Sequence, residues 1–405
     1  MKIERLPPSR GMLPGFVRFA ARIHYRRRLW RPEILWFDVP ETHGKEVGDS
    51  GDPWTLALLP AAYYWREPLE VAAPVDLVLL QNVGEIQRIW NSWTPLFQPV
   101  PVLAATQSIA APEREGRVGL FFSAGVDSFF TMLHYDAAER RQTPPKPRLV
   151  DDLIYVWGYD IPLAHREAWE QKRTALAEVA RESGKHFLPI VSNLRETRLR
   201  KLPWGRVMHG PALGAAGLLL GRRYGRLLIS SGGKMADLYP HGSHPRVDPL
   251  FSTSGTEMIR YRGDSDRFEK TAYIAESELV LRHLQVCWVG GTAKNCGRCE
   301  KCLRTLLALD LIGKREQACC FPPLPWSLDL IAQVRFGLAP EHLMADMIPY
   351  AEQRGRAEVV AALTACLENN RRWRDAEARS PWHRFKRQWK TACRRWLPFT
   401  APPDP

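Results

Sequence analysis

Small polar residues and one carboxylate are concentrated in Ser123-Ala124-Gly125-Val126-Asp127-Ser128. The apolar run Val118–Phe122 precedes this segment and predicts a buried strand, and Phe129–Leu133 after it shows a helix-like pattern. In a strand–turn–helix segment the backbone N–H groups of the turn converge, and the dipole of the following helix favours negative charge. The segment therefore has the chemistry of a phosphate-binding turn.

Individual side chains of this turn fit that chemistry. Ser123 and Ser128 can add hydroxyl donors, and Gly125 lets the backbone approach a ligand closely. Asp127, at the start of the helix, can hold Mg²⁺ against a bound phosphate. A plain capped turn, with Asp127 or Ser128 as N-cap, is the alternative.

Four cysteines form a second group with chemical potential: Cys287, Cys296, Cys299 and Cys302, at intervals of nine, three and three. Four thiolates at this spacing suit tetrahedral Zn²⁺, and two Cys-x-x-Cys steps permit a tight knuckle before the apolar segment Leu303–Leu311. A disulfide framework is disfavoured in a chain expected to be cytosolic. An iron–sulfur cluster is the chemical alternative, and chance spacing is another. Four protein ligands would close the coordination sphere, so the predicted role is structural.

A Pro/Gly-rich loop carries a third group, Asp237, His244 and Asp248. These side chains could bind a second metal, deprotonate an amine nucleophile or hold a substrate. A solvated loop with Asx and proline turns explains the same composition.

Alternating strand and helix patterns begin at Gly116 and must position these groups. Predicted strands lie at 118–122, 153–157, 186–191 and 227–230, with predicted helices at 129–140, 164–181 and 211–223. This alternation predicts an α/β fold with a parallel sheet that binds its ligand at the carboxyl ends of the strands. The turn at Ser123 follows the first of these strands.

The first 115 residues contain no known motif and predict a small α/β accessory domain. Ile34–Val39 and Trp54–Leu59 have strand character, and the second run continues through Tyr64. Val83–Trp93 has helical spacing. Four prolines, at positions 95, 99, 101 and 112, then indicate a linker.

Composition limits the class of protein. The 405 residues are 45% hydrophobic and 25% charged, which is ordinary for a globular protein of two or three domains. No apolar run reaches the length of a transmembrane helix, and no signal-peptide pattern begins the chain, so a cytoplasmic location is expected. The net charge of +13 is concentrated near the two ends, which argues against a basic nucleic-acid groove in the central region.

The C-terminal tail predicts a basic amphipathic helix. Its apolar side chains recur at spacings of three and four with basic residues between them: Trp382, Phe385, Trp389, Ala392 and Trp396. Such a helix could lie on an anionic membrane surface, contact nucleic acid or pack on the body of the protein.

The phosphate-binding turn resembles the Ser-Gly-Gly-x-Asp-Ser signature of the PP-loop ATP pyrophosphatases, with Ala124 where glycine is usual. The resemblance implies that Ser123, Ala124, Gly125, Val126, Asp127 and Ser128 hold the pyrophosphate of ATP with Mg²⁺. It also implies that Leu153–Trp157 leads to an adenine pocket, with Trp157 or Tyr159 near the base. Aromatic packing at a strand end is the alternative for either ring.

The cysteine spacing makes the resemblance more specific, because 7-cyano-7-deazaguanine synthases (QueC) have a zinc site with the same spacing after the same loop. Gly210–Gly225 is similar to their small-residue helix, and Asp237-Leu-Tyr-Pro240 to their substrate-contacting Tyr-Pro element, which assigns a substrate role to Tyr239. The resemblance covers about Gly116 to Ile312. The sequence departs from the family around Arg206–His209 and over His241–Leu250, which indicates a changed substrate or acceptor.

The resemblance implies an ATP-dependent ligase that adenylates a carboxylate, releases pyrophosphate and then transfers the acyl group to an amine. The expected organisation is an accessory domain over 1–115, a nucleotide-binding domain with zinc over 116–320, and a helical region over 321–405. A 7-deazaguanine acid is the implied substrate, with a small amine donor or a larger protein or nucleic-acid acceptor. A tRNA-modifying enzyme and a non-catalytic nucleotide sensor are the alternatives.

Overall fold

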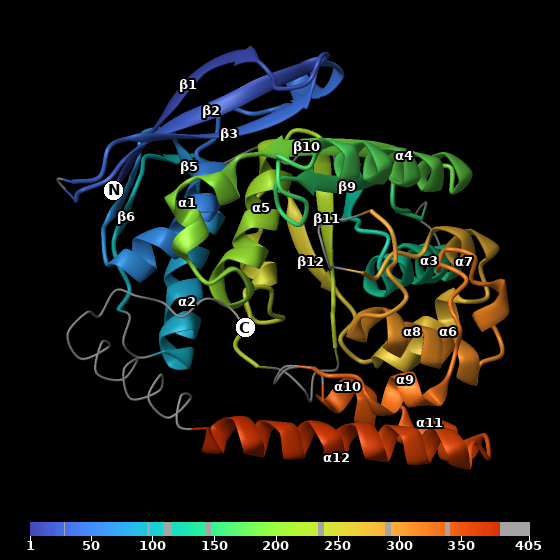
Figure 1. Ribbon diagram of the computed structural model, residues 1–405. Coiled ribbons are helices and arrows are strands. Elements are labelled where there is room, and N and C mark those ends of the chain that lie inside the picture. The colour runs from blue at the N-terminus through green and yellow to red at the C-terminus, as the bar shows by residue number, and fades with distance from the viewer. Residues whose placement is uncertain are drawn as a thin grey trace. The chain divides into compact units, whose positions relative to one another are not determined.

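The computed structural model describes residues 1–27, 29–94, 98–107, 116–142, 147–233, 239–287, 293–336 and 341–380 (Figure 1). Asp237 and the tail from Trp382 lie outside these residues. The chain divides into two compact units. Among the described residues, the first unit combines Met1–Ser123 with Thr131–Asp264, and the second combines Ala124–Phe130 with residues 265–380. The domain boundary predicted after residue 115 falls beside a segment that is not described.

A ten-stranded sheet, mostly parallel, forms the centre of the first unit in the order β12-β11-β8-β9-β10-β3-β2-β1-β4-β6. The mixed α/β class expected from the sequence is confirmed. The strands are β1 Lys2–Arg10, β2 Phe16–His24, β3 Glu33–Pro40, β4 Leu69–Val71, β6 Val102–Leu103, β8 Arg117–Phe121, β9 Asp152–Trp157, β10 His186–Ser192, β11 Tyr224–Ser230 and β12 Glu257–Tyr261. A separate two-stranded ladder pairs β5 Val75–Asp76 with β7 Thr106–Gln107.

Burial patterns explain the two halves of this sheet. Strands β8 to β12 run parallel, and β9 is buried at every residue, as expected where both faces of a sheet are covered. The antiparallel strands β1, β2 and β3 lie side by side in Figure 1, and β3 alternates buried Leu35, Phe37 and Val39 with Ile34 and Trp36, which are exposed or half-buried. Strand β3 pairs with β10 at Asp38 and Val191, so both halves belong to one sheet.

The helices of the first unit are α1 Asp52–Trp65, α2 Leu77–Trp93, α4 Arg166–Glu182 and α5 His209–Leu219, and α3 Val126–Arg141 is shared between the units. The prediction of a strand over Trp54–Leu59 was wrong, because this segment belongs to α1. Thirteen of the fourteen residues of α1 are buried, so the helix is apolar on all sides and lacks the periodicity that distinguishes a helix from a strand. Pro53 in its first turn is compatible with helix initiation.

The second unit contains helices and no strand within its described residues. They are α6 Arg267–Ile274, α7 Glu278–His283, α8 Glu300–Leu311, α9 Leu328–Ala332, α10 Glu341–Ala345, α11 Ile348–Gln353 and α12 Ala357–Arg379. Their core includes Leu307 of α8, Ile331 of α9, Met344 of α10 and Leu363 of α12, all fully buried. In the described ranges of the whole chain, no helix is long and apolar enough to span a membrane.

Strand order defines a switch point at β8. The chain passes from β8 to β9 and β10 on one side, then returns to β11 and β12 on the other side. In open α/β sheets ligands bind beyond the carboxyl ends of the strands at such a reversal. The turn that follows β8 begins at Ser123, so the topology places the start of the candidate phosphate-binding turn at the switch point.

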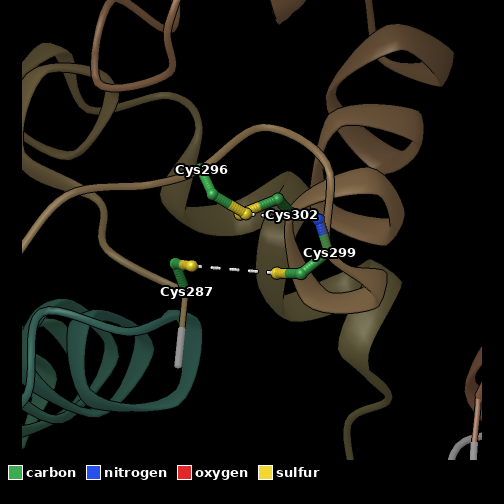
Figure 2. Close-up of side chains that lie close together, drawn as sticks. All are labelled: Cys287, Cys296, Cys299 and Cys302. Atoms are coloured by element: carbon green, nitrogen blue, oxygen red, sulfur yellow. Dashed lines mark hydrogen bonds between the residues drawn. The ribbon is translucent and has the colours of Figure 1, made fainter. Parts of the chain in front are cut away.

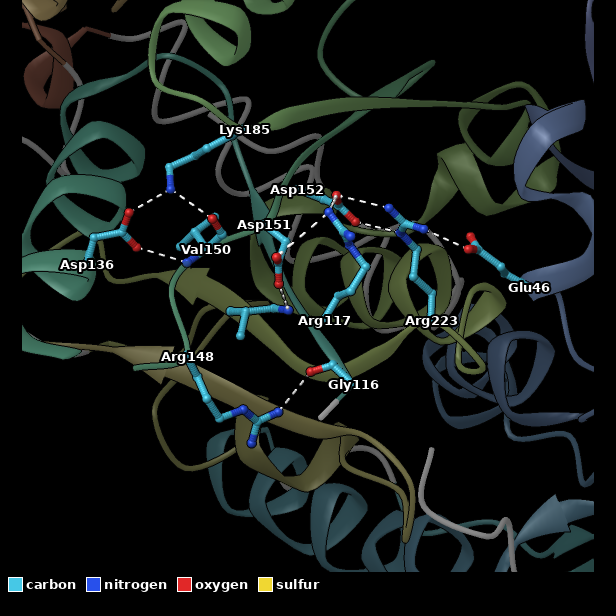
Figure 3. A network of polar contacts seen from close by, with 11 residues as sticks. Glu46, Gly116, Arg117, Asp136, Arg148, Val150, Asp151, Asp152, Lys185 and Arg223 are labelled. Atoms are coloured by element: carbon cyan, nitrogen blue, oxygen red, sulfur yellow. Dashed lines mark hydrogen bonds and ion pairs between the residues drawn. The ribbon is translucent and has the colours of Figure 1, made fainter. Parts of the chain in front are cut away.

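An ion-pair network joins the opposite, amino ends of the same strands (Figure 3). Asp152 is fully buried and accepts hydrogen bonds from Arg223 Nε at 2.5 Å and Arg117 Nη2 at 3.1 Å. Arg223 also pairs with Glu46 at 2.6 Å. Burial alone would raise the pKa of Asp152, but the hydrogen bonds and charges of the two arginines outweigh it and lower the pKa. The network therefore ties β8, β9 and β11 together through one ionised carboxylate.

Asp152→Asn should destabilise the first unit by about 2–3 kcal/mol at pH 7, because two arginines lose the anion that compensates them. Since the folded pKa of Asp152 is lowered, this contribution is present above the unfolded pKa of about 3.9 and is lost as the pH falls through the folded value. Urea unfolding at a series of pH values should show that the difference in unfolding free energy between wild type and Asp152→Asn becomes smaller below about pH 4. Asp151→Asn, at a more exposed neighbour, is the control, and an equal loss in both variants would contradict the assignment.

Candidate functional site

The turn after β8 adopts one strained conformation. Ala124 has φ +58°, in the left-handed region that favours glycine. This conformation costs a non-glycine residue about 1 kcal/mol, so surrounding contacts must hold it. Ala124 is buried, and its carbonyl oxygen accepts a hydrogen bond from Gln285 N at 2.8 Å. The alanine therefore occupies a backbone position that suits the glycine usual in the resembled loop.

The remainder of the turn is the first turn of α3. Ser128 is buried and its hydroxyl donates to Gly125 O at 3.0 Å, while Phe129 N donates to the same oxygen at 3.0 Å. Ser123, before the strained residue, is exposed. The Ser128 hydroxyl is thus engaged within its own helical turn, and Ser123 is accessible to solvent.

Asp127 lies between two cations of α6. Arg267 Nη2 is 3.0 Å from one carboxylate oxygen, and Lys270 Nζ is 3.3 Å from the other. Lys270 is only 1% exposed. Burial would raise the pKa of Asp127, but the charges of Arg267, Lys270 and Arg304 outweigh it and hold the pKa below its ordinary value. Asp127 is therefore an anion at neutral pH, and it orients two basic side chains at the turn.

Arg304 of α8 adds a third cation to this cluster, which we call the basic cluster (Arg267, Lys270 and Arg304). It is 5% exposed and pairs with Glu300 of the same helix. Burial, reinforced by the charge of Arg267, lowers the pKa of Arg304 to about 10, which still leaves it charged at neutral pH. The basic cluster thus carries three positive charges against the two negative charges of Asp127 and Glu300.

Two donors of the basic cluster are unsatisfied. The Nε atoms of Arg267 and Arg304 are shielded from solvent and have no hydrogen-bond partner among the described residues. Buried polar groups are rarely left unpaired, so an oxygen atom of a bound anion or of a water molecule would satisfy these donors. The site combines these two guanidinium N–H groups, the net positive charge of the basic cluster and the N-terminus of α3. This combination suits a polyanion.

None of the three members of the basic cluster is predicted from the sequence, because their convergence depends on tertiary packing. A local signal was nevertheless present. Asp266 and Glu269 form a capping box that starts α6, and this pattern of an acceptor followed three residues later by Glu can be recognised in a sequence. Arg267 and Lys270, three residues apart in that first turn, then fall on one helix face.

Lys172 of α4, also not predicted from the sequence, lies at the carboxyl end of β8 in the first unit. Its Nζ donates to Ser123 O at 2.6 Å, and the side chain is almost fully buried. Burial lowers the pKa of Lys172 to about 8, and the charge of Asp160 partly opposes this shift. Lys172 therefore places a positive charge beside the start of the turn.

The two aromatic residues proposed for adenine are both buried. Trp157 is stacked on Trp169 with ring centroids 5.0 Å apart, and its indole Nε1 donates to Pro162 O at 3.2 Å. Tyr159 donates its hydroxyl to Ala212 O at 2.8 Å. Both rings have packing partners here, so contact with a base would require them to rearrange.

The predicted substrate residues occupy different environments. Asp248 is fully buried and accepts hydrogen bonds from Ser243 Oγ at 2.7 Å and Arg260 Nη1 at 2.8 Å. His244 is also buried, donates its backbone N–H to Asp248 Oδ1 at 3.0 Å and packs edge-on against Trp93. Tyr239, in contrast, is half exposed. The structure brings His244 and Asp248 together in one buried network and leaves Tyr239 accessible.

The four cysteine thiols converge in the second unit (Figure 2). All four Sγ atoms lie within 4.8 Å of one another, with Cys296 and Cys302 at 3.9 Å and Cys287 and Cys299 at 3.8 Å. These distances are too long for disulfides. They match the edge of about 3.8 Å expected for a tetrahedron whose metal–sulfur bonds are about 2.3 Å. The donor set therefore fits one tetrahedral ion such as zinc.

Comparisons with known proteins add no assignment. No protein-family model matches the chain, no curated protein matches its sequence and no solved structure matches its fold. The functional interpretation therefore depends on the turn, the basic cluster and the cysteine site.

Cys302→Ser should abolish stoichiometric metal binding and lower the melting temperature, because a buried ligand is lost from a four-thiolate site. Metal content after dialysis, measured by atomic emission, should fall from one zinc per chain to a small fraction. Cys319→Ser, at an exposed cysteine outside the group, should retain the metal. A full complement of zinc in Cys302→Ser would contradict the four-cysteine assignment.

Ala124→Gly should stabilise the protein by up to about 0.5 kcal/mol, because relief of about 1 kcal/mol of strain at the left-handed alanine exceeds the entropy cost of glycine. Denaturant unfolding of the full chain provides the measurement. Ala138→Gly, in the interior of α3, is the control and should instead cost about 1 kcal/mol. A loss of stability in both variants would show that Ala124 is not strained.

Proposed function

We propose that the protein is an ATP-dependent enzyme that activates a carboxylate by forming an acyl-adenylate and releases pyrophosphate. The observation that carries the proposal is a pair of buried guanidinium N–H groups, those of Arg267 and Arg304, that have no partner among the described residues and belong to the cluster around Asp127. The position of that turn after β8, at the switch point of the sheet, also favours a nucleotide ligand. The resemblance of residues 123–128 to the PP-loop signature supports ATP in particular.

In this proposal the turn and the basic cluster bind the β- and γ-phosphates. A carboxylate oxygen of the substrate attacks the α-phosphorus, and the bond to the bridging oxygen breaks to release pyrophosphate. The charge that develops on this leaving group is neutralised by the backbone N–H groups of Ala124–Ser128 and by the side chains of Arg267, Lys270 and Arg304. An amine then attacks the acyl carbon, and AMP leaves. Catalysis consists of positioning and charge neutralisation, without a covalent nucleophile from the protein.

Asp127 has a defined part in this arrangement. Both of its oxygens are paired with cations, so in the described state it orients Arg267 and Lys270. Service as a Mg²⁺ ligand requires the carboxylate to exchange one of these partners for the metal. A Mg²⁺ ion bound there would add positive charge between Asp127 and the phosphates.

The cysteine site in this proposal holds zinc, which supplies a rigid link between its four ligands. Cys287, Cys296, Cys299 and Cys302 fill a tetrahedral sphere, so the ion has no open position for substrate. The resemblance to QueC suggests a 7-deazaguanine acid as the carboxylate, with ammonia or an amine on a larger acceptor as the nucleophile. The departures around Arg206–His209 and His241–Leu250 favour a changed acceptor.

Release of AMP and pyrophosphate from ATP tests the proposal. We expect zinc-loaded protein to release both in the presence of 7-carboxy-7-deazaguanine and an ammonium salt. Lys270→Met should lower the rate by about 100-fold or more, because one buried donor to the developing charge is lost. Lys314→Met, at a partly exposed lysine of the same unit, is the matched control and should retain the wild-type rate.

Different outcomes separate the candidate functions. Release that requires tRNA instead of the deazaguanine acid would favour a tRNA-modifying enzyme. Binding of ATP without release under any of these conditions would favour a nucleotide sensor. Failure to bind ATP at all would refute the nucleotide site itself.

A further inference from the structure

We infer that the four-cysteine metal site positions the phosphate-binding turn, and that metal binding and polyphosphate binding are therefore coupled. The inference rests on the proposed function and extends it, because a structural zinc would otherwise serve only to fold the knuckle and α8. Two short segments, each containing one ligand cysteine, connect the metal site to the turn. The part of the turn on which the inference rests, Ala124–Ser128, lies in the second unit together with both segments.

The first segment is Leu284–Cys287. Gln285, two residues before Cys287, donates its backbone N–H to the carbonyl oxygen of the strained Ala124 at 2.8 Å. This bond is one of the contacts that can hold the left-handed conformation of the turn. A shift of Cys287 would move its neighbour Gln285 and weaken that restraint.

Asn295, immediately before Cys296, fixes this first segment to the knuckle. Its side-chain oxygen accepts from Val286 N at 2.9 Å and Cys287 N at 3.2 Å, and its Nδ2 donates to Leu284 O at 2.8 Å. The residue is buried, so these bonds are protected from water. These hydrogen bonds thus connect the backbone around Cys287 to the residue next to Cys296 independently of a metal ion.

The second segment is the first turn of α8. Cys302 lies two residues before Arg304, the buried cation that interacts electrostatically with Asp127 and Arg267. The carboxylate of Glu300 pairs with Arg304 along the same helix and restricts its side chain. Arg304 Nε remains shielded and has no partner in the described part of the chain. The position of Cys302 therefore determines where this free donor lies relative to the turn.

One ion bound by all four thiolates joins the two segments. It fixes the distance between Cys287 and Cys302. It thereby also fixes the position of Arg304 relative to Gln285, whose backbone N–H holds the turn. The direct sulfur–sulfur contacts of 3.8 and 3.9 Å are weak, and a bound ion would replace them with four metal–sulfur bonds. The metal-bound form should therefore bind polyphosphate more tightly, and by linkage polyphosphate should raise the affinity for the metal by the same factor.

Competition with a zinc chelator measures this linkage on the full, reduced chain. We expect saturating magnesium pyrophosphate to tighten zinc binding by about tenfold in the wild type, within the usual range of coupling between two sites. Arg304→Gln should bring this ratio close to one while keeping the zinc affinity measured without pyrophosphate. Arg304→Lys, which retains the charge, should keep part of the ratio.

Arg298→Gln is the matched control, because Arg298 is an exposed arginine between two ligand cysteines. Arg298→Gln should show the same ratio of zinc affinities with and without pyrophosphate as the wild type. The concentration of free zinc is held equal in all samples, so that direct binding of zinc by pyrophosphate does not affect the comparison. Calorimetry on the same zinc-loaded samples reports pyrophosphate binding directly.

Three results would overturn the inference, or part of it, in distinguishable ways. Pyrophosphate binding with unchanged zinc affinity in the wild type would refute the coupling and leave the proposed function intact. Absence of pyrophosphate binding to zinc-loaded wild type would refute the proposed function, and the inference with it. A wild-type ratio in Arg304→Gln would show that Arg304 does not carry the coupling.

Discussion

The basic cluster is the constraint on which the candidate site depends. Arg267, Lys270 and Arg304 place three positive charges in a region largely shielded from solvent, where Asp127 and Glu300 pair with them. Burying uncompensated charge is costly, so a protein retains such an arrangement where a ligand supplies the missing anion. The two unpaired Nε donors indicate the same requirement in terms of hydrogen bonds.

The surrounding structure positions this cluster in several ways. The sheet reverses its strand order at β8, and α3 begins directly after the turn that follows. The capping box of α6 fixes Arg267 and Lys270 in one helical turn, and the start of α8 beside Cys302 fixes Arg304. The cysteine site and Ala124–Ser128 are thus parts of one arrangement within the second unit, although 160 residues of sequence separate Ala124 from Leu284.

The sequence predicted those features that depend on local pattern. The alternation after Gly116 gave the parallel strands, and the spacing of Cys287 and Cys302 predicted the thiol cluster. The prediction of a strand in the segment that forms α1 was wrong, because this helix is buried on all sides and its apolar residues lack helical periodicity. The basic cluster and the Gln285 bond join segments far apart in sequence. The capping-box pattern of α6 can indicate Arg267 and Lys270 on one helix face, but it does not encode their contact with Asp127.

Binding of a non-hydrolysable ATP analogue to zinc-loaded protein, measured by calorimetry, tests the central claim most directly. If the basic cluster holds the phosphates, Arg267→Gln should weaken binding by at least tenfold, because a charged donor to the polyanion is removed. Arg298→Gln, an equivalent change at an exposed position, should bind as the wild type does. Equal affinity in wild type and Arg267→Gln, or no binding by either, would contradict the account.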